Sequence, residues 1–210
     1  MRILYIDTSS SYLYTSIVED NKVLSEIKEE YGQSLSEVAL PRIASMFEDN
    51  NIKPKDIDKI IVVNGPGSFT GIRIGLTIAK VYAWSLNIPI TTIYSLEAMA
   101  ISSKENKYHV PLINARRGYV YTSIYDENYN AVLKPCHILL TDLQDKLKDI
   151  SNYEYISNDE FDDLELVSYS PDMAKVVEYF KDKENINPHA VNPEYLKLTE
   201  AEESKLWYMN

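Results

Sequence analysis

Residues 65–80, GPGSFTGIRIGLTIAK, follow a short β-branched run at 60–63 and lead into a helical pattern at 70–86. A short apolar run of this kind is typical of a buried strand. The unit is therefore a strand, a glycine-rich turn and a helix. Its spacing fits neither common phosphate-binding loop: Gly71 falls one residue late for a dinucleotide loop, and the Gly-Lys-Ser/Thr ending of a Walker A loop is missing.

The predicted helix carries a stripe of small residues. Gly71, Gly75, Ala79 and Ala83 recur every four positions and therefore share one helix face. A glycine inside a helix costs roughly 1 kcal/mol relative to alanine. The stripe therefore indicates that another backbone approaches this face closely.

Most of the remaining surface of this helix is also apolar, and Arg73, Thr77 and Lys80 form a narrow polar strip. A helix that is apolar nearly all round is buried on more than one side. Its own sheet covers one side. The other cover is either a neighbouring helix of the same chain or a partner protein. The shortage of other long apolar helices favours a partner.

Composition limits the classes of function. The chain has 210 residues, 45% of them hydrophobic, and a net charge of −11. This length suits two small lobes, and so acidic a chain is a poor candidate for binding a nucleic-acid backbone by itself. The lone Cys136 is interpreted as a packed or free thiol. No signal peptide and no apolar run near the ~18 residues of a membrane span is found, so we expect a soluble, cytoplasmic protein.

The order of the predicted elements indicates an α/β fold. Three strands near the N-terminus form an antiparallel meander, and two strand–helix alternations follow it. Asp7 ends the first strand, as in ribonuclease-H-like and actin-like folds. The predicted fold class is therefore a two-lobed actin-like (ASKHA, ribonuclease-H-like) α/β fold, with mixed sheets and flanking helices. The segments predicted for the first lobe are 2–6, 12–18, 23–27, 36–49, 60–63, 70–86, 88–93 and 96–101.

The predicted organisation has three parts. Residues 1–102 form the first lobe, residues 103–190 a smaller α/β lobe, and residues 191–210 a tail that docks back on the first lobe. The tail ends in an apolar group, Leu206 to Tyr208, which gives a reason for docking because an exposed terminal tryptophan is unusual. The segments predicted for the second lobe are strands at 110–114, 117–125, 131–133 and 153–156, and helices at 141–147 and 171–180.

The sequence shows no active site. Asp7 is one carboxylate at a strand end, but a two-metal nuclease needs several, and the central strand ends in the uncharged Asn64. The turn at 8–11 has no glycine, unlike the phosphate loops of actin-like kinases. The three histidines are far apart and lack metal-ligand spacing. We therefore expect Asp7 to cap its turn, and we expect no metal and no cofactor.

Arg116 and Arg117 are the only adjacent pair of basic residues, and they stand at a predicted hairpin turn. We favour a structural role for them, a hairpin corner with salt links to the acidic surface. The alternative is a contact with RNA or a nucleotide.

Four motifs give the chain a family resemblance. IDTSS at 6–10, GPGSFTGIRIG at 65–75, NARRG at 114–118 and PEYL at 193–196 resemble the TsaB (YeaZ) family over the whole chain. The Leu40-Pro41 pair matches the same family in its first helix. The resemblance implies a two-lobed actin-like scaffold without the metal site of its paralogue TsaD.

The resemblance also implies a function. TsaD-type proteins transfer threonylcarbamoyl to the adenosine beside the anticodon of tRNA, and TsaB-type proteins are non-catalytic subunits that bind and activate them. A TsaE-type ATPase joins the two. The implied partners are therefore a TsaD-type subunit in a heterodimer, a TsaE-type ATPase, and tRNA only through the complex.

The resemblance places the partner interface on the helices at 36–49 and 70–86, in agreement with the stripe. A bulky replacement such as Gly75→Leu is then expected to abolish heterodimer formation while the lobe stays folded. The residues predicted for the interface are Val38, Ile43, Phe47, Gly71, Ile72, Gly75, Leu76, Ala79 and Ala83.

Two alternatives stay open. Asp7 and the glycine turn also fit a nucleotide-binding phosphotransferase or a peptidase-like protein, with nucleotide or RNA contacts at Asp7, Arg116 and Arg117. The same apolar helices can also pair with a second copy of the chain when the partner is absent.

Overall fold

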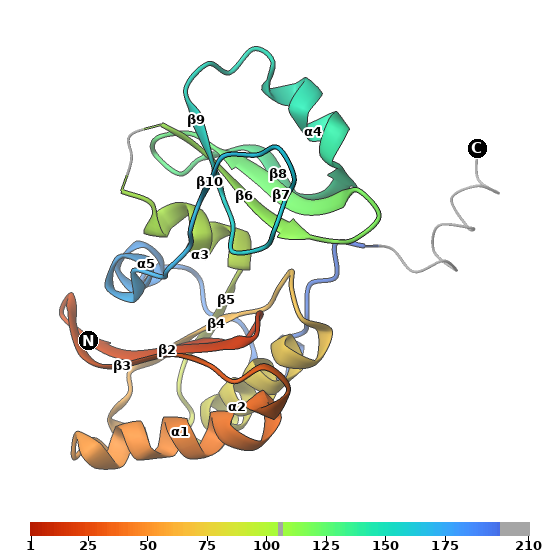
Figure 1. Cartoon of the computed structure of the whole chain (residues 1–210). Helices are drawn as coiled ribbons and strands as arrows, with labels where there is room; N and C mark the ends of the chain where they lie inside the picture. Colours follow the sequence, from red (N-terminus) through yellow and green to blue (C-terminus); the bar gives the residue numbers. More distant parts are fainter. Residues whose placement is uncertain (105–106, 198–210) are drawn as a thin grey trace.

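A computed structural model describes residues 1–104 and 107–197. Two five-stranded sheets lie one above the other, with helices between them and on both outer sides (Figure 1). The strand order is β3-β2-β1-β4-β5 in the first sheet and β10-β9-β6-β7-β8 in the second. Two mixed sheets with flanking helices are the predicted fold class, which is confirmed.

The first sheet is built from both predicted kinds of pairing. β1 pairs with β2 and β2 with β3 in antiparallel fashion, whereas β1 pairs with β4 and β4 with β5 in parallel. The predicted meander and the predicted mixed sheet are therefore confirmed. The bounds are β1 Arg2–Asp7, β2 Tyr12–Glu19, β3 Lys22–Glu30, β4 Lys59–Val63 and β5 Ile90–Ile93.

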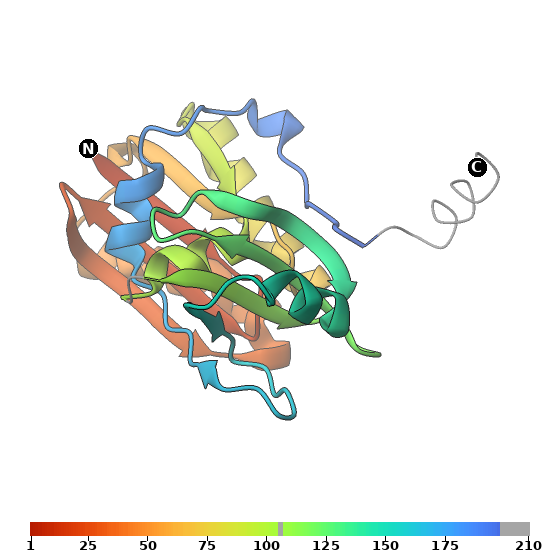
Figure 2. The ribbon, with the colours of Figure 1, turned by 90° about the horizontal axis from the view of Figure 1, so that it is seen from above.

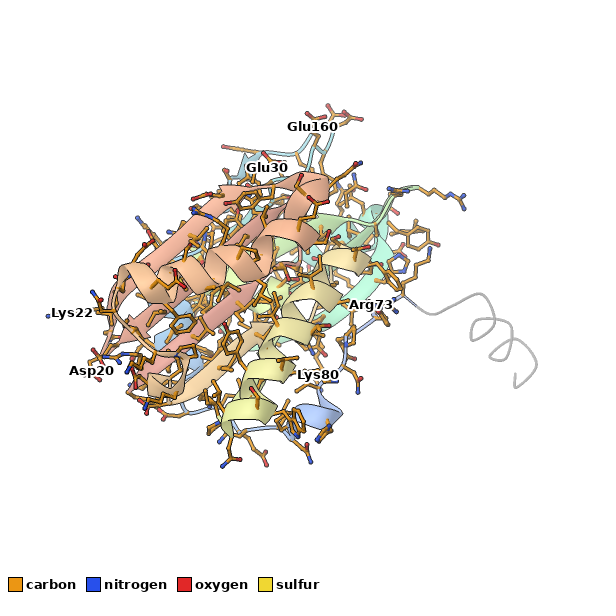
Figure 3. The ribbon with its side chains drawn as sticks, turned by 90° about the horizontal axis from the view of Figure 1, so that it is seen from below. Asp20, Lys22, Glu30, Arg73, Lys80 and Glu160 are labelled. Atoms are coloured by element: carbon orange, nitrogen blue, oxygen red, sulfur yellow. The ribbon has the colours of Figure 1, made fainter. Side chains whose placement is uncertain are left out.

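Two long helices cover the outer face of the first sheet. α1 (Leu35–Asp49) and α2 (Phe69–Leu86) lie side by side below it (Figure 1, Figure 3). Their inward side chains join Leu4, Ile6 and Ile60 in one apolar core. Two short 3-10 helices, η1 (Gly32–Ser34) and η2 (Pro54–Asp56), flank α1 in sequence.

The second sheet has its own core under one helix. α4 (Leu140–Leu147) packs on its outer face, with Leu143 and Leu147 fully buried. β8 continues to Leu139, past the predicted end at 133; it lies at the sheet edge, where Pro135 is tolerated because no neighbour needs its missing N–H. The bounds are β6 Tyr108–Asn114, β7 Tyr119–Tyr125, β8 Ala131–Leu139, β9 Tyr153–Ile156 and β10 Leu166–Val167.

The layer between the sheets holds α3 (Ser95–Ser102) and α5 (Met173–Phe180), which lie side by side (Figure 1, Figure 2). Met173, Val176 and Phe180 of α5 pack against the inner face of the first sheet. The prediction placed residues 103–190 in the second lobe, and this part of it needs correction. Although α5 follows the strands of the second sheet in the chain, its apolar face packs on the first sheet.

The segment after α5 returns along the first lobe. It passes through η3 (Pro188–Ala190), and Val191 is buried in the core beneath α2. Lys80 Nζ donates to the Val191 carbonyl (2.9 Å), and Arg73 Nε donates to the Tyr195 hydroxyl (2.9 Å). Both cations project from α2 toward this segment (Figure 3). The polar strip of α2 therefore holds residues 191–195. The predicted apolar end, Leu206 to Tyr208, lies outside the described residues.

Candidate functional site

A cleft of about 1010 Å³ opens between the two sheets. One wall is the turn after β1 with the start of α2, and it presents Asp7, Ser9 and Ser68. The other wall comes from the end of β6 and includes Asn114 and Arg116. The cleft therefore brings Asp7 and Arg116, which the sequence singled out, to one place. Arg117 does not line it.

Asp7 is a buried carboxylate held by its own turn. Its Oδ1 accepts a hydrogen bond from the Ser9 amide (2.8 Å), and its Oδ2 accepts a long one from the Tyr5 hydroxyl (3.4 Å). Burial raises the pKa of Asp7, and these hydrogen bonds partly oppose the shift. The prediction that Asp7 caps its turn is confirmed. Within residues 1–104 and 107–197, no cluster of three or more histidine, cysteine or acidic side chains could hold a metal ion.

The glycine turn packs on the same strand end. The Ser68 amide donates to the Ser9 carbonyl (2.7 Å), and a Cβ on Gly67 would lie only 2.2 Å from that oxygen. Gly67 also has φ +152°, which favours glycine. The Ser68 hydroxyl caps α2 by accepting from the Gly71 amide (3.2 Å). This turn therefore holds the start of α2 against the end of β1. Gly67 has a structural role in that contact.

The small-residue stripe meets the same segment. A Cβ on Gly71 would lie 2.1 Å from the Thr8 carbonyl oxygen, and a Cβ on Gly75 would lie 2.3 Å from Thr8 Oγ1. That hydroxyl donates to the Gly71 carbonyl (2.8 Å). The backbone that approaches the stripe therefore belongs to the chain itself. This corrects the interpretation that the stripe fits a partner, and Gly75→Leu would disrupt the lobe as well as any interface.

The other predicted interface residues also face inward. Val38 is half-buried, and the remaining ones are buried within the chain: Ile43, Phe47, Ile72, Leu76, Ala79 and Ala83. They fill the core between the helices and the first sheet. In this structure the buried residues are therefore not accessible to a partner protein.

The same two helices expose a different apolar set. Leu40 of α1 is 50% exposed, and Val81 and Trp84 of α2 are 58% and 67% exposed. The two helices contact each other, and large exposed apolar side chains on adjoining elements are a mark of an interaction surface. The sequence analysis did not single out these residues, because α2 is apolar nearly all round. The available signal was that α2 has more apolar side chains than one sheet can cover.

The β6–β7 hairpin places the two arginines at its tip. The Tyr119 amide donates to the Arg116 carbonyl (3.0 Å), and Asn114 Oδ1 accepts from the Arg116 amide (2.8 Å). Among the described residues, neither Arg116 nor Arg117 makes an ion pair or a hydrogen bond through its guanidinium. The favoured interpretation of a salt-linked corner therefore needs correction, since no carboxylate there holds either side chain.

The comparisons with known proteins agree with this architecture. A tRNA threonylcarbamoyladenosine biosynthesis protein TsaB from Bacillus subtilis (strain 168) is 33% identical, and the match covers 96% of each chain. The chain belongs to the TsaB family. The Escherichia coli (strain K12) protein of the same name is 31% identical over 64% of this chain and 63% of its own.

A protein-family model and a solved structure extend the comparison. The family described as "TsaD: tRNA N6-adenosine threonylcarbamoyltransferase" matches residues 21–203. A Pseudomonas aeruginosa crystal structure, of an uncharacterized protein with similarity to peptidase YEAZ, superposes with a TM-score of 0.76 at 16% identity, covering 93% of this chain and 99% of that one. This likeness shows the two-lobed fold. In the described part of the chain, no helix combines the length and the apolar character that crossing a membrane requires.

Proposed function

We propose that the chain is a non-catalytic subunit of the assembly that places threonylcarbamoyl on the tRNA adenosine beside the anticodon, and that it binds and activates a TsaD-type catalytic subunit. Membership of the TsaB family supports a part in threonylcarbamoyladenosine biosynthesis. The match to the TsaD family supports a partner of related fold. The observation that carries the proposal is the exposed apolar surface on α1 and α2.

That surface, defined by Leu40, Val81 and Trp84, replaces the buried stripe as the proposed interface. α1 and α2 lie next to each other on one side of the molecule (Figure 3), so a partner that covers both helices would bury these side chains. Burying a large aliphatic side chain contributes about 1.5–3 kcal/mol relative to exposure. Tryptophan is the residue type most often found as an interface hot spot. Trp84 is therefore the main candidate anchor.

A scaffold role also agrees with the cleft. Asp7 is one of three acidic residues that line it, with Glu30 and Asp159, and its Oδ1 already accepts a hydrogen bond from the Ser9 amide. Gly67, in the turn after β4, fits against the turn after β1, since a Cβ there would lie 2.2 Å from the Ser9 carbonyl oxygen. These observations support an accessory subunit over the phosphotransferase or peptidase-like alternative. Mg-ATP titration with no heat and no hydrolysis is the expected result.

The test is co-purification with a TsaD-type protein from the same genome, followed by a titration. Trp84→Ala and Val81→Asp are expected to weaken binding about 30-fold or more, the size of a hot spot of ~2 kcal/mol. Val132→Asp is the matched control, because Val132 on β8 is 57% exposed, against 58% for Val81. It should bind as the wild type does.

Equal loss of binding in Val132→Asp, or unchanged affinity in both α2 variants, would contradict the proposed surface. Each variant is first checked for an unchanged melting temperature. Light scattering of the chain alone, across dilution, tests whether the same surface pairs two copies. Addition of a TsaE-type ATPase to the purified heterodimer tests the third subunit, and tRNA is expected to bind through the complex.

A further inference from the structure

The tip of the β6–β7 hairpin has an unusual backbone. Arg116, Arg117 and Gly118 have φ of 66°, 55° and 78°, three consecutive left-handed residues. This conformation is natural for glycine but costs a residue with a side chain roughly 1 kcal/mol or more. The hairpin hydrogen bonds of Asn114 and Tyr119 hold it in place. The chain therefore keeps two arginines where glycine or asparagine would cost less.

The two guanidinium groups are available to a ligand. Among the described residues, nothing pairs with them, and both side chains are exposed. The carboxylate beside them, Asp159, accepts a hydrogen bond from the Asn114 amide (2.7 Å). In Figure 2 the hairpin tip reaches beyond the neighbouring elements of the second sheet. The tip is thus a local cationic point on an acidic protein.

A row of aromatic rings begins next to the arginines. Tyr119 and Tyr121 share one face of β7, and His137 of β8 is paired directly with Tyr121. The centroids of Tyr119 and His137 are 4.7 Å apart with nearly parallel planes (11°), and those of Tyr121 and His137 are 5.2 Å apart. Tyr119, at the outer end, is 39% exposed. The row ends at the cleft, which Tyr121 lines.

We infer that this surface, Arg116, Arg117 and Tyr119, binds RNA directly, with the arginines on backbone phosphates and the Tyr119 ring stacked on a base. Adjacent cationic and aromatic side chains are the combination that single-stranded nucleic acid requires, because every nucleotide offers a phosphate and a π-face. The inference rests on the proposed function, since it makes this subunit contact the tRNA that the complex modifies.

The placement favours an RNA over a small nucleotide inside the cleft. Only Arg116 of the pair lines the cleft, while Arg117 does not. The cleft is also lined by the carboxylates of Asp7, Glu30 and Asp159, which would repel phosphate groups. An extended polyanion can instead lie across the hairpin tip. Because the whole chain carries a net charge of −11, this contact adds to binding by the partner and is weak alone.

The test measures binding of an unmodified tRNA transcript to the heterodimer with a TsaD-type protein, by fluorescence anisotropy over a salt series. The double variant Arg116→Ala/Arg117→Ala should lower affinity on the order of 10-fold and reduce the slope of log K against log salt by about 1.5, for two lost phosphate contacts. Tyr119→Leu should weaken binding at least about 5-fold, and Tyr119→Phe, which keeps the ring, should not.

The control is Lys22→Ala/Lys55→Ala, which removes two exposed cations elsewhere on the first lobe. Equal effects of this pair and the arginine pair would overturn the inference, as would no effect of either. Full displacement of tRNA by AMP would assign the site to a mononucleotide and overturn it too. Heterodimer formation is measured separately in each variant, so failure of the proposed function is recognised by itself. In that case the chain alone is titrated, and the same variants must still differ.

Discussion

The contact between α2 and the residue after β1 predicts that Gly75→Ala destabilises the wild type but stabilises a Thr8→Ala variant. In a helix, Gly75→Ala normally stabilises by about 1 kcal/mol. Here the new Cβ would lie 2.3 Å from Thr8 Oγ1 but 3.5 Å from Thr8 Cβ and from Ile6 Cγ2. The hydroxyl is therefore the single obstacle. Removing it by Thr8→Ala leaves ordinary van der Waals contacts.

The magnitude follows from what the hydroxyl does. To make room for the new methyl group, Thr8 must turn away and lose its 2.8 Å hydrogen bond to the Gly71 carbonyl. A buried hydroxyl left without a partner costs about 1–3 kcal/mol. Against the helix gain of about 1 kcal/mol, Gly75→Ala should destabilise the wild type by about 1–2 kcal/mol once crowding is added. In the Thr8→Ala background the same change should stabilise by about 0.5–1 kcal/mol.

Gly71→Ala is the matched control. Its Cβ would lie 2.1 Å from the Thr8 carbonyl oxygen, which Thr8→Ala leaves in place. It should therefore destabilise both backgrounds. The assay is urea unfolding followed by circular dichroism for the four chains of each double-mutant cycle. If Gly75→Ala stabilises the wild type, or destabilises both backgrounds equally, the reasoning is refuted.

Two further predictions concern buried charges. Burial raises the pKa of Asp7, so its ionised form costs stability once the pH rises above the ordinary value of about 3.9. Asp7→Asn should therefore raise the urea midpoint at pH 7, and the gain should shrink as the pH falls toward 4; a gain that is constant with pH would contradict this cause. Lys59 Nζ donates to the carbonyls of Lys181 (2.9 Å) and Lys183 (2.5 Å), just after α5. Lys59→Met should cost about 2 kcal/mol in urea unfolding because two carbonyls lose their donor, whereas Lys22→Met, at an exposed site, should cost almost nothing.

The sequence by itself determined the local structure and the fold class. Short apolar runs separated by turns predicted the strands of the first sheet, and the spacing after Gly65 excluded two phosphate-loop types. Asp7 was correctly predicted to cap its turn, because an aspartate at a strand end followed by Thr-Ser-Ser forms that hydrogen bond locally. These features depend on neighbours within a few residues.

The candidate site depended on contacts between residues far apart in the sequence, which sequence patterns do not predict. The glycine stripe correctly predicted a close backbone, yet helix periodicity only says which residues share a face. It cannot say whether that face meets a strand of the same chain or a partner. The stripe faces Thr8 of the same chain, 63 residues away from Gly71, whose carbonyl and hydroxyl groups pack against it. The outward face, with Val81 and Trp84, was then left exposed. Which side of an all-round apolar helix is free is thus a property of the tertiary structure, because only packing assigns its faces.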